Sequence, residues 1–169
     1  FASTAKAASS PQKQNESLLA LARARFGSLS RAELRLLEAA PRGEMARCGP
    51  SNRDDDPAND PANADTWGRE REIRAELLRW LSIDRDAAER IDPRGIRIHA
   101  AKVVGPLDLS FAEVPFPLSL LHCRLTGHTD LRYARIPVLD LGGTWTRSIT
   151  ADGVNVQGSV FLREGFTAE

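Results

Sequence analysis

Short three-residue segments recur at a constant interval through the second half of the chain, in two interleaved ladders. The segments alternate apolar, polar and apolar side chains, apart from Thr129, as a strand with one buried face requires. The first ladder consists of residues 96–98, 107–109, 118–120 and 129–131, and the second of residues 101–103, 112–114, 123–125 and 134–136. Such regular spacing predicts a solenoid, in which each coil pairs with the coils above and below it.

Glycine and proline residues lie between successive segments, where a chain has to turn. Four segments therefore make one coil of about 22 residues, a repeat length typical of solenoids. The register shortens by one position at 139–141, is lost around 144–152 and returns at 154–156 and 160–162. Residues 92–169 would then form about 3.5 coils, with neighbouring strands ~4.8 Å apart.

The second ladder places small residues at its first inward position, namely Ala101, Ala112, Cys123 and Ala134. Units such as 112–116 (AEVPF) and 134–138 (ARIPV) resemble the pentapeptide repeats written A(D/N)LXX, over about residues 96–167. This resemblance implies a right-handed quadrilateral parallel β-helix. The fold class expected is therefore α+β, with an N-terminal helical region that caps the solenoid.

The helix around Ile73 to Leu81, followed by Gly95 and a divergent repeat, is also similar to a bacterial group often labelled membrane-associated oxidoreductase. That resemblance implies an alternative, in which the chain is part of a larger membrane-associated protein whose catalytic or membrane segment lies elsewhere. No glycine-rich dinucleotide fingerprint or other cofactor motif stands in the sequence, so no cofactor is expected.

The N-terminal half divides into four segments. Residues 1–14 are small and polar and predict a disordered tail. Residues 15–42 predict a helical hairpin, which Gly27 interrupts and in which Ser30 and Glu33 form a capping box. Residues 43–66, with repeated Asp, Pro, Ala and Asn, predict an acidic linker. Residues 67–91 contain an apolar stripe typical of a helix from about Gly68 to Leu81, which would cap the first coil.

The charge balance argues against nucleic acid as a partner. Lys and Arg together number 23 in the whole chain, as do Asp and Glu. From residue 92 onward there are eight bases and eight acids. Pentapeptide-repeat proteins that mimic DNA have a strongly negative rod, so a neutral solenoid favours neither DNA mimicry nor DNA binding.

Two cysteines far apart in the sequence, Cys48 and Cys123, indicate a reducing compartment and therefore a cytoplasmic protein, membrane-associated if a longer protein supplies an anchor. No apolar run approaches the ~18 residues that span a bilayer, so no membrane insertion by these residues is expected.

No catalytic or metal site is expected. His122, Cys123 and His128 could suggest zinc, but Cys123 occupies an inward core position. The aspartates between residues 54 and 65 could suggest calcium, but the glycine and terminal glutamate of the twelve-residue calcium loop are absent.

The most consistent function is a non-catalytic scaffold or protein-interaction module. The side chains predicted to face outward, and hence to contact a partner, are Arg97, Asp108, Arg124, Asp130, Arg132 and Arg135. The sequence stops in mid-pattern at Thr167, so we expect the solenoid either to continue beyond Glu169 or to associate with a second copy through its open C-terminal end.

Overall fold

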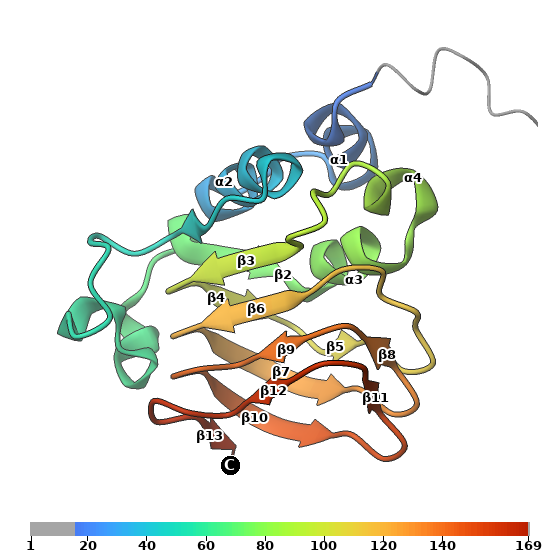
Figure 1. The fold of residues 1–169 in the computed structure, drawn as a ribbon. Coiled ribbons are helices and arrows are strands. Elements are labelled where there is room, and N and C mark those ends of the chain that lie inside the picture. Colours follow the sequence, from blue (N-terminus) through green and yellow to red (C-terminus); the bar gives the residue numbers. More distant parts are fainter. Residues whose placement is uncertain (1–15, 169) are drawn as a thin grey trace, which may run out of the picture.

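The computed structural model describes residues 16–168, which form an N-terminal helical region followed by a parallel β-solenoid of about three turns (Figure 1). The α+β fold class predicted from the repeat is therefore confirmed. The predicted tail, residues 1–14, lies outside the described residues.

The α-helices of the N-terminal region lie at one end of the solenoid, and the short helical turns around residue 60 (teal-green) lie beside it (Figure 1). The α-helices are α1 (Leu18–Phe26), α2 (Arg31–Ala39), α3 (Ala75–Ile83) and α4 (Arg85–Ala88). The 3₁₀ helices are η2 (Ala40–Arg42), η3 (Pro57–Asn59), η4 (Pro61–Thr66) and η5 (Arg69–Arg71). Gly27 ends α1 with a φ of 71°, and the capping box between Ser30 and Glu33 is present at the start of α2.

Parallel strands stack in three sheets. The first has the order β1 (Ala46–Arg47), β3 (Ile96–His99), β6 (Leu118–Leu121), β9 (Leu139–Asp140) and β12 (Val160–Phe161). The second has the order β2 (Glu72–Arg74), β4 (Lys102–Val104), β7 (Arg124–Asp130), β10 (Trp145–Thr150) and β13 (Thr167–Ala168), with β5 (Leu107–Asp108) also paired to β7. The third sheet pairs β8 (Arg135–Ile136) with β11 (Asn155–Val156).

The pairing register gives the coil its four sides. Ile96 pairs with Leu118, and Leu118 pairs with Leu139, one position earlier than a constant repeat would give, as the shortened register predicted. The long strand β7 turns a corner within itself, because its first part pairs with β4 and its last part with β5. At that corner a Cβ on Gly127 would lie 2.5 Å from the carbonyl of Gly105 in the coil above, so only glycine fits.

The apolar ends of the repeated segments point into the solenoid. Ile96, Ile98, Ala101, Val103 and Cys123 are each 0% exposed, and Leu131 is 2% exposed. The buried apolar residues of the helices and of the solenoid form one continuous cluster. The inward positions read from the ladders are therefore those of the core.

The rung around residues 144–152, where the repeat is lost in the sequence, is present in the structure. Trp145 pairs with Arg124, and the small inward position before it is held by Thr144. The Thr144 hydroxyl donates to the Leu120 carbonyl and accepts from the Cys123 N–H, so this buried polar side chain is fully bonded. At this inward position, Thr144 replaces the apolar side chain of the other coils with a hydroxyl that bonds the coil above. The repeat is therefore difficult to recognise in the sequence here.

Two strands from the N-terminal region complete the top of the solenoid. β1 pairs with β3, and β2 pairs with β4. The helix predicted from Gly68 instead begins at Ala75, because Glu72–Arg74 is used as a strand. Residues 43–66, expected as a linker, contain β1, η3 and η4, and Asn59 within them is fully buried.

Two corners of the coil use left-handed backbone at the same position in successive turns. One corner carries Ala100, His122, Gly143 and Glu164, and another carries Phe111, Tyr133 and Gly153, all with φ between 50° and 65°. A positive φ is uncommon outside glycine, so five of these seven residues are held there by the coil geometry. Phe111, Tyr133 and Glu164 are exposed at these corners, whereas Ala100 is fully buried.

Candidate interaction surface

Aspartates immediately before the corners stabilise the turns by accepting backbone hydrogen bonds. The carboxylate of Asp108 accepts the backbone N–H of Ser110, that of Asp130 accepts the N–H of Arg132, and that of Asp140 accepts the N–H of Gly142. Each is an Asx turn, in which an aspartate side chain bonds the backbone two positions later. Asp108 and Asp130 were predicted as contact residues, and both are bonded to the solenoid's own backbone.

Asp130, at the end of β7, and Arg132 form a close ion pair. The guanidinium Nη2 lies 2.7 Å from Oδ2 of Asp130, and Nε also donates to this carboxylate. These hydrogen bonds, first of all those from the Arg132 side chain, lower the pKa of Asp130 to about 2. Asp130 pairs in register with Asp108 of the coil above, so the structure brings these three predicted residues together.

The other three predicted residues are spread around the solenoid. Arg135 lies on β8 and pairs with Glu113 of the coil above at 3.0 Å. Arg97 lies on β3, half-buried, and donates to the Gly43 carbonyl of the cap. Arg124 lies on β7, with its guanidinium 5.4 Å from the centre of the Trp145 ring. They do not form one patch.

An aromatic pair stands out on the second left-handed corner. Phe111 and Tyr133 stack with their ring centres 5.1 Å apart, and they are 74% and 56% exposed. The lower face of Tyr133 is closed by Gly153, where a Cβ would lie 2.5 Å from the ring. Arg79 and Ile83 of α3 border the same region, which encloses a hollow of about 800 Å³ together with Glu113 and Arg135. We call Phe111, Tyr133, Arg79, Ile83 and Arg135 the aromatic surface.

The apolar and polar alternation of the ladders identifies core positions only, so it does not predict the aromatic surface. A signal was present, since Phe111 and Tyr133 each precede the small inward residue of a unit and occupy the same place in successive coils. A large apolar residue in a corner position of two successive coils has no place in the core. It therefore has to lie on the surface.

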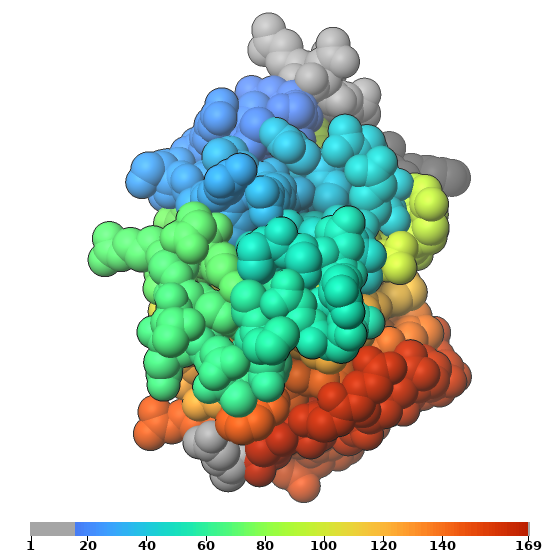
Figure 2. Space-filling view, turned by 90° about the vertical axis from the view of Figure 1, so that its left-hand side faces the viewer, coloured from blue at the N-terminus to red at the C-terminus, as the bar shows by residue number. Residues whose placement is uncertain are grey.

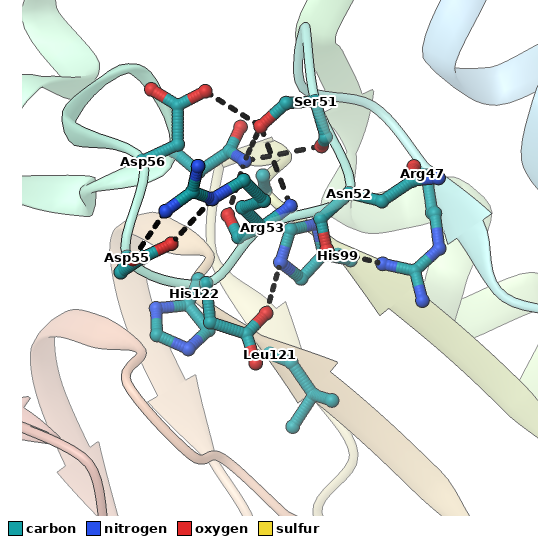
Figure 3. Close-up of polar contacts among 12 residues, drawn as sticks. Arg47, Ser51, Asn52, Arg53, Asp55, Asp56, His99, Leu121 and His122 are labelled. Carbon is teal, nitrogen blue, oxygen red and sulfur yellow. Dashed lines mark hydrogen bonds and ion pairs between the residues drawn. The ribbon is translucent and has the colours of Figure 1, made fainter.

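Histidines and aspartates meet at the other left-handed corner. Figure 3 shows the loop carrying Ser51 to Asp56 folded over His99 and His122. Asp54 Oδ1 lies 2.9 Å from Nε2 of His99, whose side chain is only 1% exposed. Burial lowers the pKa of His99, although the pairing with Asp54 acts in the opposite direction. A neutral His99 that donates from Nε2 therefore ties the acidic loop to β3.

The remaining aspartates of this loop also have structural contacts. Asp56 and Asp60 cap the two short 3₁₀ helices by accepting the N–H groups of Ala58 and Ala62. Asp55 pairs with Arg53 at 2.7 Å. Within residues 16–168, no three His, Cys, Asp or Glu side chains are placed to hold a metal ion.

Both cysteines are buried free thiols. Burial raises the pKa of Cys48 to about 11 and that of Cys123 to about 12. At neutral pH both are therefore protonated, whereas a reactive cysteine needs a substantial thiolate fraction. Cys123 fills the small inward position between Ala101 and Thr144, as its place in the repeat predicted.

No protein-family model, curated protein or solved structure matches this chain. The fold is thus established by its own geometry, and the resemblance to pentapeptide-repeat proteins rests on the repeat alone. In the part of the chain that the structure describes, no helix has the length and apolar character needed to cross a membrane.

Proposed function

We propose that this chain is a non-catalytic protein-interaction module, and that a protein partner binds its aromatic surface. The observation that carries the proposal is the exposed stack of Phe111 on Tyr133. Aromatic and arginine side chains dominate the binding energy of protein interfaces. Here two rings and two arginines border one hollow.

The backbone of the aromatic surface supports this proposal. Phe111 and Tyr133 have φ of 58° and 55°, a conformation that is unfavourable for bulky residues. Hydrogen bonds of Phe111 N–H to Arg132 and of Tyr133 N–H to Asp152 hold both corners to the coil below. Rings on such a rigid support lose little entropy when they bind, which favours affinity.

The charged residues predicted from the sequence would then form the rim of this interface. Asp108 is linked to Arg79 of the aromatic surface, with an Oδ2–Nη1 distance of 3.5 Å, and Arg135 borders the hollow. Exposed pairs of this kind contribute little to stability but orient partners and tune association rates. We therefore propose Asp108, Arg132 and Arg135 as rim contacts, whereas Asp130, which is only 9% exposed, holds Arg132 in place.

Replacing both rings tests the proposal. We expect Phe111→Asn with Tyr133→Asn to weaken partner binding at least tenfold, because truncating aromatic anchors typically costs about 2 kcal/mol or more. Asparagine tolerates left-handed backbone, so the coil should remain folded. The measurement is isotope-labelled affinity capture from cells with the wild-type and variant chains, followed by titration of each purified candidate.

The matched control is Arg147→Ala, an exposed substitution on β10 away from the aromatic surface. A partner of the proposed kind is captured by the control variant but not by the double variant. In titrations, the purified partner also binds the double variant more weakly than the control variant. If every partner that survives purification binds the double variant as tightly as wild type, the aromatic surface is not the interface.

The last described rung supports a second proposal, self-association through that end. No described strand pairs with the outer edges of β11, β12 and β13. Val160 and Leu162, which belong to the apolar positions of the repeat, are 48% and 52% exposed. Unpaired strand edges beside exposed apolar side chains favour pairing with another chain.

For the full chain we expect a dimer in sedimentation experiments at about 100 µM, a concentration that detects micromolar dissociation constants. Leu162→Asp should shift it to monomer, because the new carboxylate would be desolvated between the two rungs. Gln157→Asp adds the same charge at an exposed site of this rung and should leave the dimer intact. A wild-type chain that sediments as a monomer at this concentration refutes self-association.

A further inference from the structure

A second hollow lies on a different face, where α2 meets the segment that connects β1 to β2. Figure 2 shows this face, with α2 in blue above residues 48–66 in teal and the segment leading into β2 in green. The hollow measures about 520 Å³. Three arginines line it, Arg31 and Arg35 from α2 and Arg71 from η5, together with Trp67.

Arg71 is a buried cation without a direct counter-ion. It is 6% exposed, and its guanidinium donates to the backbone carbonyls of Ala58 and Ala100. No carboxylate of residues 16–168 contacts its guanidinium, although Asp56 and Glu70 are near enough to act on its charge. The guanidinium lies 3.5 Å from the centre of the Trp67 ring. Burial lowers the pKa of Arg71, but a guanidinium stays charged. A buried charge without an opposite charge in contact is unfavourable.

Trp67 adds a donor that is also unused. This residue is 7% exposed, and its indole Nε1 has no hydrogen-bond partner within residues 16–168. An indole N–H can only donate, and a buried donor without an acceptor is rare and costly. Beside one hollow, Trp67 therefore leaves a donor without an acceptor, and Arg71 leaves a cation that no carboxylate contacts.

Arg31 and Arg35 supply further positive charge from the opposite wall. They are four positions apart on α2 and so lie on one face of the helix. Arg35 donates to the Arg47 carbonyl, which fixes its position without neutralising it. Glu70 is the one carboxylate among the lining residues. Its carboxylate lies close to Gly68, since a Cβ added to that glycine would be only 2.2 Å from Oε2 of Glu70.

We propose that this hollow binds a small anion through Arg31, Arg35, Arg71 and the Trp67 N–H. The ligand class is a phosphate monoester or a carboxylate, since both offer several acceptor oxygens and a charge that guanidinium groups recognise. The site is distinct from the aromatic surface and does not depend on the proposed protein partner.

Titration calorimetry of the full chain with inorganic phosphate, and separately with succinate, tests this site. We expect at least one anion to bind and to raise the melting temperature, because a ligand that binds only the folded state stabilises it. Phosphate binding alone assigns the phosphate class, and succinate binding alone assigns the carboxylate class. Absence of binding by both anions at about 10 mM overturns the proposal, since a dissociation constant above that concentration is too weak for a specific anion site.

Variants separate this site from general attraction to a positive surface. Arg31→Ala and Arg35→Ala should each weaken binding about tenfold, as expected for loss of a charge-assisted hydrogen bond. Trp67→Phe keeps the ring against Arg71 but removes the N–H, and should weaken binding about fivefold. Glu70→Gln should tighten binding, because it removes the one lining carboxylate.

Arg69→Ala is the matched control, because Arg69 is exposed, lies in the same segment and does not line the hollow. It should bind as wild type does. Each variant is first checked for an unchanged circular dichroism spectrum, and Arg31 and Arg35 are suited to this because neither is buried. Equal affinity of wild type and the Arg31→Ala, Arg35→Ala double variant would also overturn the proposal.

Discussion

Leu131→Asp is expected to unfold the solenoid at temperatures where the wild-type chain remains folded. Leu131 is 2% exposed and belongs to the continuous core of the solenoid. Aspartate at this position would place an unpaired charge among apolar side chains and remove a well-packed leucine. We expect a loss of about 4–5 kcal/mol in the free energy of unfolding, at the upper end of single substitutions.

In a chain of this size, that loss corresponds to a fall of roughly 10–20 °C in melting temperature. Circular dichroism and differential scanning calorimetry measure it directly. Leu131→Ala should give a smaller loss of about 2–3 kcal/mol, because it leaves a cavity without burying a charge. This ordering separates the effect of the charge from the effect of lost packing.

The neighbouring residue provides the control. Arg132 is exposed and pairs with Asp130, so Arg132→Ala should move the melting temperature by only a few degrees. The same variant should raise the pKa of Asp130 from about 2 towards its ordinary value, because the largest cause of its lowering is removed. Equal losses of stability in Leu131→Asp and Arg132→Ala would refute the assignment of inward and outward positions.

The repeat predicts the solenoid well because each coil forms the same contacts as its neighbours. An inward position must be apolar in every coil, so spacing alone identifies Leu131, Cys123 and Ile136 as core residues. The same argument fails where a contact occurs once. β1 and β2 pair only with the first coil, and their short segments carry no repeat that could reveal it.

The candidate sites are harder to predict from the sequence than the solenoid, because they combine segments that are distant along the chain. His99 and Asp54 are 45 residues apart, and only the folded loop brings them together. Arg31 and Arg71 meet only because α2 packs against η5 and β2. Phe111 and Tyr133 were within reach, since their equivalent places in the repeat put them on successive coils.

Glu33 is the group that ties the helical cap to the solenoid. Its carboxylate is only 3% exposed and accepts the Ser30 N–H, the Arg74 N–H and two bonds from the Arg74 guanidinium. Arg74 in turn donates to the Phe26 carbonyl at the end of α1. The pair therefore joins α1 and α2 to β2, the strand that covers the first full coil at β4.

We expect Glu33→Ala to reduce the free energy of unfolding by about 3–5 kcal/mol, because it leaves the Arg74 guanidinium and two backbone N–H groups without their acceptor. Urea denaturation at neutral pH measures the loss. Glu38→Ala, at an exposed position on the same helix, is the matched control and should change stability by less than about 0.5 kcal/mol. Comparable losses in the two variants would contradict a special role for Glu33.

Acid should release the same link. Burial raises the pKa of Glu33, but the hydrogen bonds from Arg74 and Ser30 outweigh it, so the pKa lies below its ordinary value of 4.5. A lowered pKa in the folded state means that Glu33 stabilises the fold fully above pH 4.5 and loses this contribution as the pH falls through its folded pKa. Glu33→Gln, which cannot titrate, should therefore show a smaller stability loss than wild type between pH 5 and pH 2, roughly the window in which this contribution disappears. Parallel pH profiles for the two chains would mean that the link between cap and solenoid does not depend on the charge of Glu33.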